Sequence, residues 1–372
     1  GDVVAGAFSW TDDTTVPPAG TSDQPVTFVP TDTNNYANAE ANTSVTAEAL
    51  IYVDDDFTDA TPGWGVWCFA TIQGGVDASA VGGTVNVAAG NYAEHVVIDK
   101  SLSLLGADPA TTTIDGGNTG VVATITGNAV TMSGFTVTGS GTGATDGGIG
   151  LIGVAGCTIE NNVVAGNATG IGLLSAIGNL VSNNVVTGNG YGIALDKYLE
   201  NPGSTGNVVA DNAVFGNLAA GIYAGEASGN TLQGNAVYSN GGDGIYLWHA
   251  NSWLIVDNVV TGNASHGIEF MGSASNQVIG NVVSLNALDG LLWRDTALDI
   301  AGNVVASNDL SGNVGRSLVN EDPDATIVAG SNYWGTADGP SGAGYSGSGG
   351  GASGLLEMDS FYATENAGVL SD

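Results

Sequence analysis

The sequence is very poor in positive charge. Its 372 residues include 4 Lys and Arg against 37 Asp and Glu, so the formal net charge is −33. A surface with this charge repels nucleic acids and anionic membranes, and nothing in the sequence resembles a basic binding patch, so no nucleic-acid partner is expected. It also attracts counter-cations. No cofactor is indicated, and calcium is the ion that we expect if the protein binds one.

Other absences narrow the possibilities further. No run of 18 apolar residues occurs, so no membrane-spanning helix is predicted. Cys68 and Cys157 are the only cysteines. They permit one disulfide in an oxidising compartment, and two separate buried thiols fit the sequence equally well. No Ser-His-Asp order, phosphate-binding loop or zinc spacing is found. The start at Gly1 and the scarcity of Lys fit an exported chain, so we expect an extracellular or cell-surface location.

What the sequence has in abundance is a repeat. From Cys157 onward each unit contains an Asn, a β-branched pair, a second Asn five residues later, and then Gly followed by an aliphatic residue. The first asparagine recurs at Asn162, Asn184, Asn212, Asn235, Asn258, Asn281 and Asn303. The second recurs at Asn167, Asn189, Asn217, Asn240, Asn263, Asn286 and Asn308. In this alignment Ile300 lies three residues before the last first-position asparagine, and Val305 lies two residues after it.

The spacing predicts an all-β solenoid. Intervals between successive first asparagines are 22, 28, 23, 23, 23 and 22 residues. The apolar runs between turns are short and alternate with period two, which is typical of strands. Three strands and three turns in about 22–23 residues form one coil, and stacked coils pair in parallel roughly 4.8 Å apart. The long interval indicates a loop over 197–205.

Equal positions in stacked coils form ladders, which explains the asparagines. Their amides both donate and accept, so successive copies can bond to one another. Asparagine also tolerates the left-handed backbone of a tight turn. The Gly before each third strand likewise suits a positive φ.

We divide the chain into three parts. Residues 1–48 form an arm with one strand-like piece at Pro25–Pro30, residues 49–340 form the solenoid, and residues 341–372 form a Gly-rich linker and tail. Val66–Ala80 has the apolar spacing of a helix and precedes the first coil. It is predicted to cap that end, because an open solenoid end aggregates.

Several segments resemble the pectate-lyase-like right-handed parallel β-helix superfamily, particularly its NosD-like repeat proteins. The segments are IYVDDD at 51–56, FATIQGGVDASAVGGTVNVAAGNYAEHVVIDKSLSLLGA at 69–107, the Asn coils, and SNYWGTADGPSG at 331–342. The resemblance implies a single right-handed β-helix with a short N-terminal helix. It is weak for activity, because the superfamily includes lyases, epimerases, hydrolases and proteins without known catalysis.

One face collects the candidate site residues. Alignment on the Gly-Ile strand places an aromatic and basic group outward, which predicts a glycan-binding or interface face: Tyr223, Tyr246, Trp248, Met271 and Arg294. Catalytic candidates on it are Arg294, His249, Lys197 and Glu269. A purely structural interpretation pairs Lys197 with Glu226 and Asp295 with Arg316 in neighbouring coils. His95 and His266 stand alone and are predicted to be structural.

Two functions follow. Lyases of the resembled superfamily generally use a calcium-binding carboxylate cluster, and no dense Asp cluster occurs on the coils. We therefore favour an extracellular, non-catalytic structural protein whose copies join head to tail in a filament, sheath or surface layer. The alternative is a polysaccharide lyase, an epimerase or a glycan-binding β-helix acting on an acidic polysaccharide.

Overall fold

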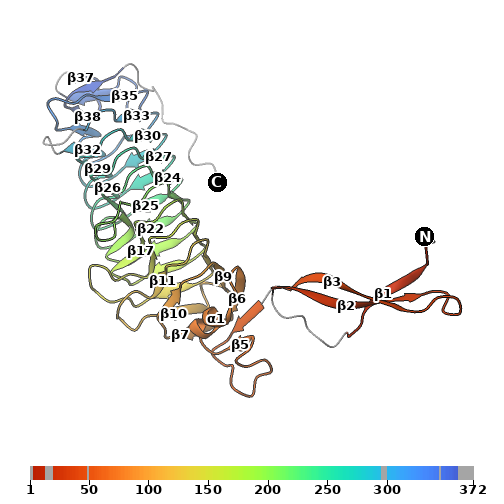
Figure 1. Cartoon of the computed structure of the whole chain (residues 1–372). Coiled ribbons are helices and arrows are strands. Elements are labelled where there is room, and N and C mark those ends of the chain that lie inside the picture. The colour runs from red at the N-terminus through yellow and green to blue at the C-terminus, as the bar shows by residue number, and fades with distance from the viewer. Residues whose placement is uncertain (1–2, 13–19, 48–49, 295–299, 343–344, 359–372) are drawn as a thin grey trace.

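A computed structural model describes residues 3–12, 20–47, 50–294, 300–342 and 345–358. Most of the chain forms a solenoid in which parallel sheets run along a common axis (Figure 1). No helix in these ranges is long and apolar enough to cross a membrane. The solenoid predicted from the repeat is confirmed.

Three sheets build the solenoid within the described ranges. The largest has 14 strands: β4 Leu50–Val53, β5 Cys68–Phe69, β6 Gly83–Val87, β9 Leu102–Gly106, β12 Thr131–Ser133, β15 Thr158–Glu160, β18 Leu180–Ser182, β21 Val208–Ala210, β24 Thr231–Gln233, β27 Leu254–Val256, β30 Gln277–Ile279, β33 Val304–Ala306, β35 Ile327–Gly330 and β39 Leu356–Glu357. The smallest has nine: β7 Gly90–Tyr92, β10 Thr112–Asp115, β13 Thr136–Thr138, β16 Val163–Ala165, β19 Val185–Thr187, β22 Ala213–Phe215, β25 Ala236–Tyr238, β28 Val259–Thr261 and β31 Val282–Ser284.

The third sheet carries the candidate site. Its 13 described strands are β8 Val96–Ile98, β11 Ala123–Ile125, β14 Ile149–Ile152, β17 Thr169–Leu174, β20 Tyr191–Asp196, β23 Ile222–Gly225, β26 Ile245–Trp248, β29 Ile268–Met271, β32 Leu291–Arg294, β34 Leu318–Asn320, β38 Gly349–Ser353, β36 Pro340–Gly342 and β37 Tyr345–Ser346. Inward side chains of all three sheets form one continuous apolar core. Because the side-chain period is two, every second residue of each strand is left facing outward.

A short helix closes the N-terminal end of this core. Helix α1 spans Ile72–Ala78, with Thr71 as its N-cap, so it is shorter than the predicted Val66–Ala80. Ile72 and Val76 are buried in the core. The carboxylate of Glu94 accepts hydrogen bonds from the N–H groups of Ile72 and Gln73, which satisfies two of the free donors at the helix start.

Ladders of hydrogen-bonded asparagines join successive coils. Asn212, for example, donates from its backbone N–H and from its side-chain Nδ2 to Oδ1 of Asn235, both at 3.0 Å. The left-handed conformation, however, falls on the residue before the ladder asparagine, as at Asn183 before Asn184. The prediction that the ladder asparagine itself takes the positive φ is wrong.

The end of the array is shifted from the predicted alignment. Asn281 pairs with Asn308, and Asn286 pairs with Asn313. Asn303 instead belongs to a third ladder, which sequence alignment missed: Asn179, Asn207, Asn230, Asn276 and Asn303, with Trp253 replacing one member. Correspondingly, Val305 pairs with Val278. Within one coil an Asn-x-Val pattern occurs twice, five residues apart. An alignment of coils that is shifted by five residues therefore matches equally well.

The glycine before each third strand is also explained differently. At Gly221 a Cβ would lie 2.6 Å from Cγ1 of Val237, 2.6 Å from Nδ2 of Asn240 and 2.8 Å from a backbone oxygen. No positive φ is found there. Close packing on the next coil, and not the predicted backbone conformation, requires glycine at this position.

The two cysteines are free and buried, Cys68 in β5 and Cys157 just before β15. In the 14-stranded sheet five strand steps separate β5 from β15. At about 4.8 Å per step the thiols lie roughly 24 Å apart, far beyond disulfide reach. Of the two possibilities that the sequence left open, two separate thiols is the one observed.

The two ends contain more strands than predicted. Strands β1 Gly6–Trp10, β2 Gly20–Pro30 and β3 Ala39–Ala47 form a separate antiparallel sheet, drawn apart from the solenoid in Figure 1. At the other end β38 pairs with β34 and β39 pairs with β35. The Gly-rich segment is therefore partly a further coil and not a linker, because a sheet edge supplies backbone hydrogen bonds whatever the side chains. Residues 359–372 of the predicted tail lie outside the described residues.

Candidate functional site

The outward face of the 13-stranded sheet has a graded composition along the axis. Strand register places one residue of each coil in a central column: Gly150, Gly172, Ala194, Tyr223, Tyr246, Glu269 and Leu292. The column thus runs from small residues through two tyrosines to a carboxylate. A second column, three residues after the first aliphatic position, contains Trp248, Met271 and Arg294 in successive coils.

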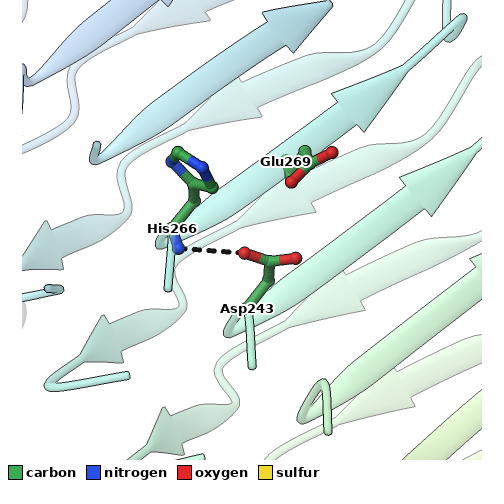
Figure 2. A group of neighbouring side chains, drawn as sticks. All are labelled: Asp243, His266 and Glu269. Atoms are coloured by element: carbon green, nitrogen blue, oxygen red, sulfur yellow. Dashed lines mark hydrogen bonds between the residues drawn. The ribbon is translucent and has the colours of Figure 1, made fainter. Parts of the chain in front are cut away.

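A cluster of titratable groups lies beside Glu269. Figure 2 shows Asp243, His266 and Glu269, whose candidate ligand atoms all lie within 4.8 Å of one another. The backbone N–H of His266 donates to Asp243 Oδ1 at 2.9 Å. His266 Nδ1 lies 3.1 Å from the backbone nitrogen of Asp289, which donates to it, and 3.4 Å from Oδ2 of Asp289. These contacts hold the imidazole in place.

Arg294 completes the cluster. Its Nε donates to Glu269 Oε1 at 2.7 Å, and its Nη2 contacts the same oxygen. The Glu269 side chain is 3% exposed, whereas that of Arg294 is 45% exposed. Burial raises the pKa of Glu269 and the neighbouring Asp243 raises it further, while Arg294 opposes both effects. The buried Glu269 carboxylate therefore fixes the guanidinium of Arg294, whose remaining N–H donors face solvent.

Tyrosines form a row that leads toward this cluster. The ring centroids of Tyr191 and Tyr223 are 5.5 Å apart, and those of Tyr223 and Tyr246 are 5.8 Å apart. Burial raises the pKa of Tyr223 to about 12, and it also raises the pKa of Tyr246. Both phenols therefore stay protonated at neutral pH. Tyr246 donates its hydroxyl to Met271 Sδ at 3.1 Å.

The remaining predicted site residues lie outside the cluster. Lys197 forms the expected ion pair with Glu226, at 2.8 Å between Nζ and Oε2. His249 stacks on Trp248 with ring centroids 4.5 Å apart. Among the hydrogen bonds, ion pairs and ring contacts of the described residues, none joins Lys197 or His249 to Glu269 or Arg294, so the structure separates both from the cluster.

The other predicted charge pair is not supported. Asp295 lies outside the described residues. Arg316 lies just before β34, at the beginning of the strand, where its backbone N–H donates to Asp289 Oδ1 at 2.7 Å. A pair with Asp295, which follows the last residue of β32 in the sequence, would instead need Arg316 to follow β34.

Sequence reasoning missed a third outward column. It lies two residues before the first aliphatic residue of each strand and contains Asp243, His266, Asp289 and Arg316 in successive coils. His266 was predicted to stand alone because the alignment compared only the residues that follow the Gly-Ile pair. Extending the same alignment two residues upstream would have revealed the alternation of acidic and basic residues.

Comparison with known families agrees with this architecture. The model of the family described as periplasmic copper-binding protein (NosD) matches residues 79–202 and 123–345, more than half of the chain. The chain belongs to the NosD family. No curated protein sequence matches this NosD-family chain.

Solved structures show the same fold. The A-module of mannuronan C-5 epimerase AlgE6 from Azotobacter vinelandii is 18% identical, with 84% of this chain and 99% of that chain covered and a TM-score of 0.58. Pectate lyase Pel9A is 14% identical, with 88% and 82% covered and a TM-score of 0.57. The Dettilon tailspike protein is 16% identical, with 84% and 68% covered and a TM-score of 0.59. The NosD-family chain is thus a pectate-lyase-like right-handed parallel β-helix.

The family description names copper, and the side chains of this chain do not fit that ion. Biological copper sites are built mainly from imidazole, thiolate and thioether ligands. Among the described residues the one group with metal-ligand spacing contains a single imidazole, that of His266. Its Glu269 is bound by Arg294, so a divalent cation there would face a guanidinium. Cys68 and Cys157 are buried apart from it.

Proposed function

We propose that this NosD-family chain binds an acidic polysaccharide along the face from Tyr191 to Arg294 and removes the C5 proton of a uronate unit. The observation that carries the proposal is the row of three tyrosines leading to a half-exposed Arg294, which is paired with Glu269, the neighbour of the His266 imidazole. Aromatic faces stack on sugar rings, and a guanidinium pairs with a carboxylate in a fixed orientation. The family's periplasmic description supports a location outside the cytoplasm.

The names of structural relatives support the same choice over the filament that the sequence favoured. A mannuronan C-5 epimerase, a pectate lyase and a tailspike protein share the fold. In the epimerase and the lyase, by their names, this architecture acts on polysaccharides. The structural function had rested in part on the lack of a catalytic cluster. The group around Glu269 removes that reason.

The chemistry can be assigned to individual side chains. Arg294 pairs with the uronate carboxylate and so acidifies the C5–H bond. His266 is the candidate base: it takes this proton on Nε2, in the tautomer whose Nδ1–H points to Asp289 Oδ2 in place of the hydrogen bond from Asp289 N–H. In a lyase the electron pair then forms the C4–C5 double bond, the C4–O bond breaks, and Tyr246 protonates the departing oxygen. In an epimerase C5 instead takes a proton on the opposite face. Glu269 is a positioning residue for Arg294.

Incubation with uronate polymers in D2O tests the proposal. An epimerase returns a solvent deuteron to C5, whereas a lyase leaves a C4–C5 double bond without a C5 hydrogen, which ultraviolet absorbance detects. The wild type should form one of these two products, and Arg294→Ala should lower its rate about 100-fold. Arg316→Ala, which removes the other exposed arginine near this sheet, should leave the rate unchanged. If cleavage occurs, Tyr246→Phe should slow it, because the departing oxygen then lacks its proton donor. A wild type that neither binds, deuterates nor cleaves any of a broad uronan panel would overturn the proposal.

A further inference from the structure

A trough lies on the same face, on the N-terminal side of Tyr223. It encloses a cavity of about 220 Å³. Its floor is the small-residue part of the central column, contributed by Gly150, Gly172 and Ala194 in three successive coils. The rings of Tyr191 and Tyr223 bound the end that points toward the titratable cluster. The trough and the cluster are thus two parts of one face.

The fold does not require the glycine at the centre of this trough. A Cβ at Gly172 would have no neighbour nearer than a backbone oxygen at 4.0 Å, and φ there is not positive. Two residues earlier, a Cβ at Gly170 would lie 2.6 Å from Cγ1 of Val186, so that glycine is needed for packing. Glycine weakens a strand interior. Its presence at Gly172 therefore keeps space open above the sheet, which points to a ligand.

The polar groups around the trough are acidic. Asp146 and Asp196 line it, and no Lys, Arg or His is among its described lining residues. Lys197, the nearest basic residue along the chain, has its Nζ bound to Glu226 at 2.8 Å. Carboxylates accept hydrogen bonds from hydroxyl groups and repel another carboxylate. The chemistry of the lining favours a ligand with many hydroxyls and no negative charge.

We propose that this trough is a subsite for an uncharged pyranose ring, which rests on the apolar floor against Tyr191 and Tyr223 and donates hydroxyl hydrogen bonds to Asp146 and Asp196. The proposal rests on the proposed function, because it assumes that a polysaccharide lies along this face. The strand of Gly172 and the strand of Arg294 are five steps apart in the sheet. At about 4.8 Å per step that is roughly 24 Å, long enough for several sugar units. The substrate is then a polymer that contains neutral sugars as well as uronates.

Calorimetric titration of the full chain with neutral gluco-, manno- and galacto-oligosaccharides tests this subsite. The wild type should bind at least one of them, and Gly172→Val should weaken that binding at least tenfold without lowering the melting temperature. Gly330→Val is the matched control, since a Cβ at Gly330 in β35 also meets nothing within 4 Å and lies in the 14-stranded sheet. It should bind like the wild type. If Gly172→Val does not fold, Ala194→Leu fills the same trough from the next coil.

The outcomes separate the two proposals. Absence of binding to every neutral oligosaccharide, or equal binding by wild type and Gly172→Val, overturns the subsite whatever happens at C5. Binding that depends on Gly172, together with neither C5 deuteration nor cleavage of any uronan, keeps the subsite and overturns the proposed reaction. An effect of Gly330→Val as large as that of Gly172→Val would also overturn the subsite, because the loss would then reflect the fold.

Discussion

A ladder asparagine such as Asn235 uses both ends of its amide. Its Oδ1 accepts from Asn212, and its Nδ2 donates to Val209 O at 2.8 Å and to Asn258 Oδ1 at 2.9 Å. The residue is fully buried. If this side chain is lost, the groups that bond to its amide lose that partner. Because the site is buried, water cannot replace it.

We expect Asn235→Leu to lower the free energy of unfolding by about 1–3 kcal/mol for each buried group left unpaired. Denaturant titration measures the change. Asn201→Leu, at an exposed loop position, is the control and should stay within about 0.5 kcal/mol of the wild type. Equal stability of the two variants would contradict a role for the ladder.

Glu269 provides a test through pH. Because burial raises its pKa above the ordinary 4.5, the folded state favours the protonated form. Its contribution to stability is therefore fully present below that ordinary value and is lost as the pH rises through the raised value. Glu269→Gln remains neutral throughout. Relative to the wild type, this variant should gain stability as the pH is raised from 4 toward 8.

Melting temperatures of both proteins across this range measure the difference, with Glu200→Gln in an exposed loop as the surface control. A difference between Glu269→Gln and wild type that shrinks toward neutral pH would show that the ion pair with Arg294 outweighs the burial of the carboxylate.

At the scale of elements, each coil contacts only its neighbours, so stability is nearly a sum of coil and interface terms. Helix α1 supplies the neighbour that the first coil would otherwise lack. A Cβ at Gly75 would meet Val53, Val85 and Ile51, which shows how closely the helix lies on β4 and β6. Helix α1 therefore packs closely against β4 and β6 as part of the apolar core.

Truncation of the cap should act locally. We expect Ile72→Ala to cost about 2–5 kcal/mol and to speed amide hydrogen exchange in β4 and β6, while β28 and β31 keep their protection. Ile255→Ala, in the middle of the array, is the matched control and should raise exchange on both sides of β27. Uniform loss of protection along the whole array in Ile72→Ala would mean that the solenoid unfolds as a single unit.

At the scale of the whole molecule, a net charge of −33 opposes both compaction and the approach of a polyanion. Added salt screens this repulsion, since the Debye length falls from about 10 Å at 0.1 M to about 3 Å at 1 M. We expect the melting temperature and the affinity for a uronan to rise with sodium chloride. Binding of a neutral oligosaccharide in the trough should change little, and an affinity for uronan that falls with salt would argue against net repulsion.

Calcium-dependent head-to-tail assembly stays a prediction. Light scattering of concentrated full-length protein with and without calcium measures it, at matched ionic strength. Deletion of residues 1–48, whose strands β1 to β3 pair with one another and not with the solenoid sheets, should give monomers with an intact β-helix. Full-length protein that stays monomeric in calcium would rule out this mode of assembly.

The sequence alone determined the solenoid, its coil length and its two main ladders, because a repeat places equal residues at equal heights and its apolar period marks the strands. It did not determine the register at Asn303, since a pattern that repeats every five residues tolerates a shift by five. The tertiary structure alone decided which columns face the same space. It placed Arg294 on the Glu269 carboxylate, set Nδ1 of His266 against Asp289 and left the space above Gly172 open, because an alignment gives the height of each residue in the array but not the direction of its side chain or the space around it.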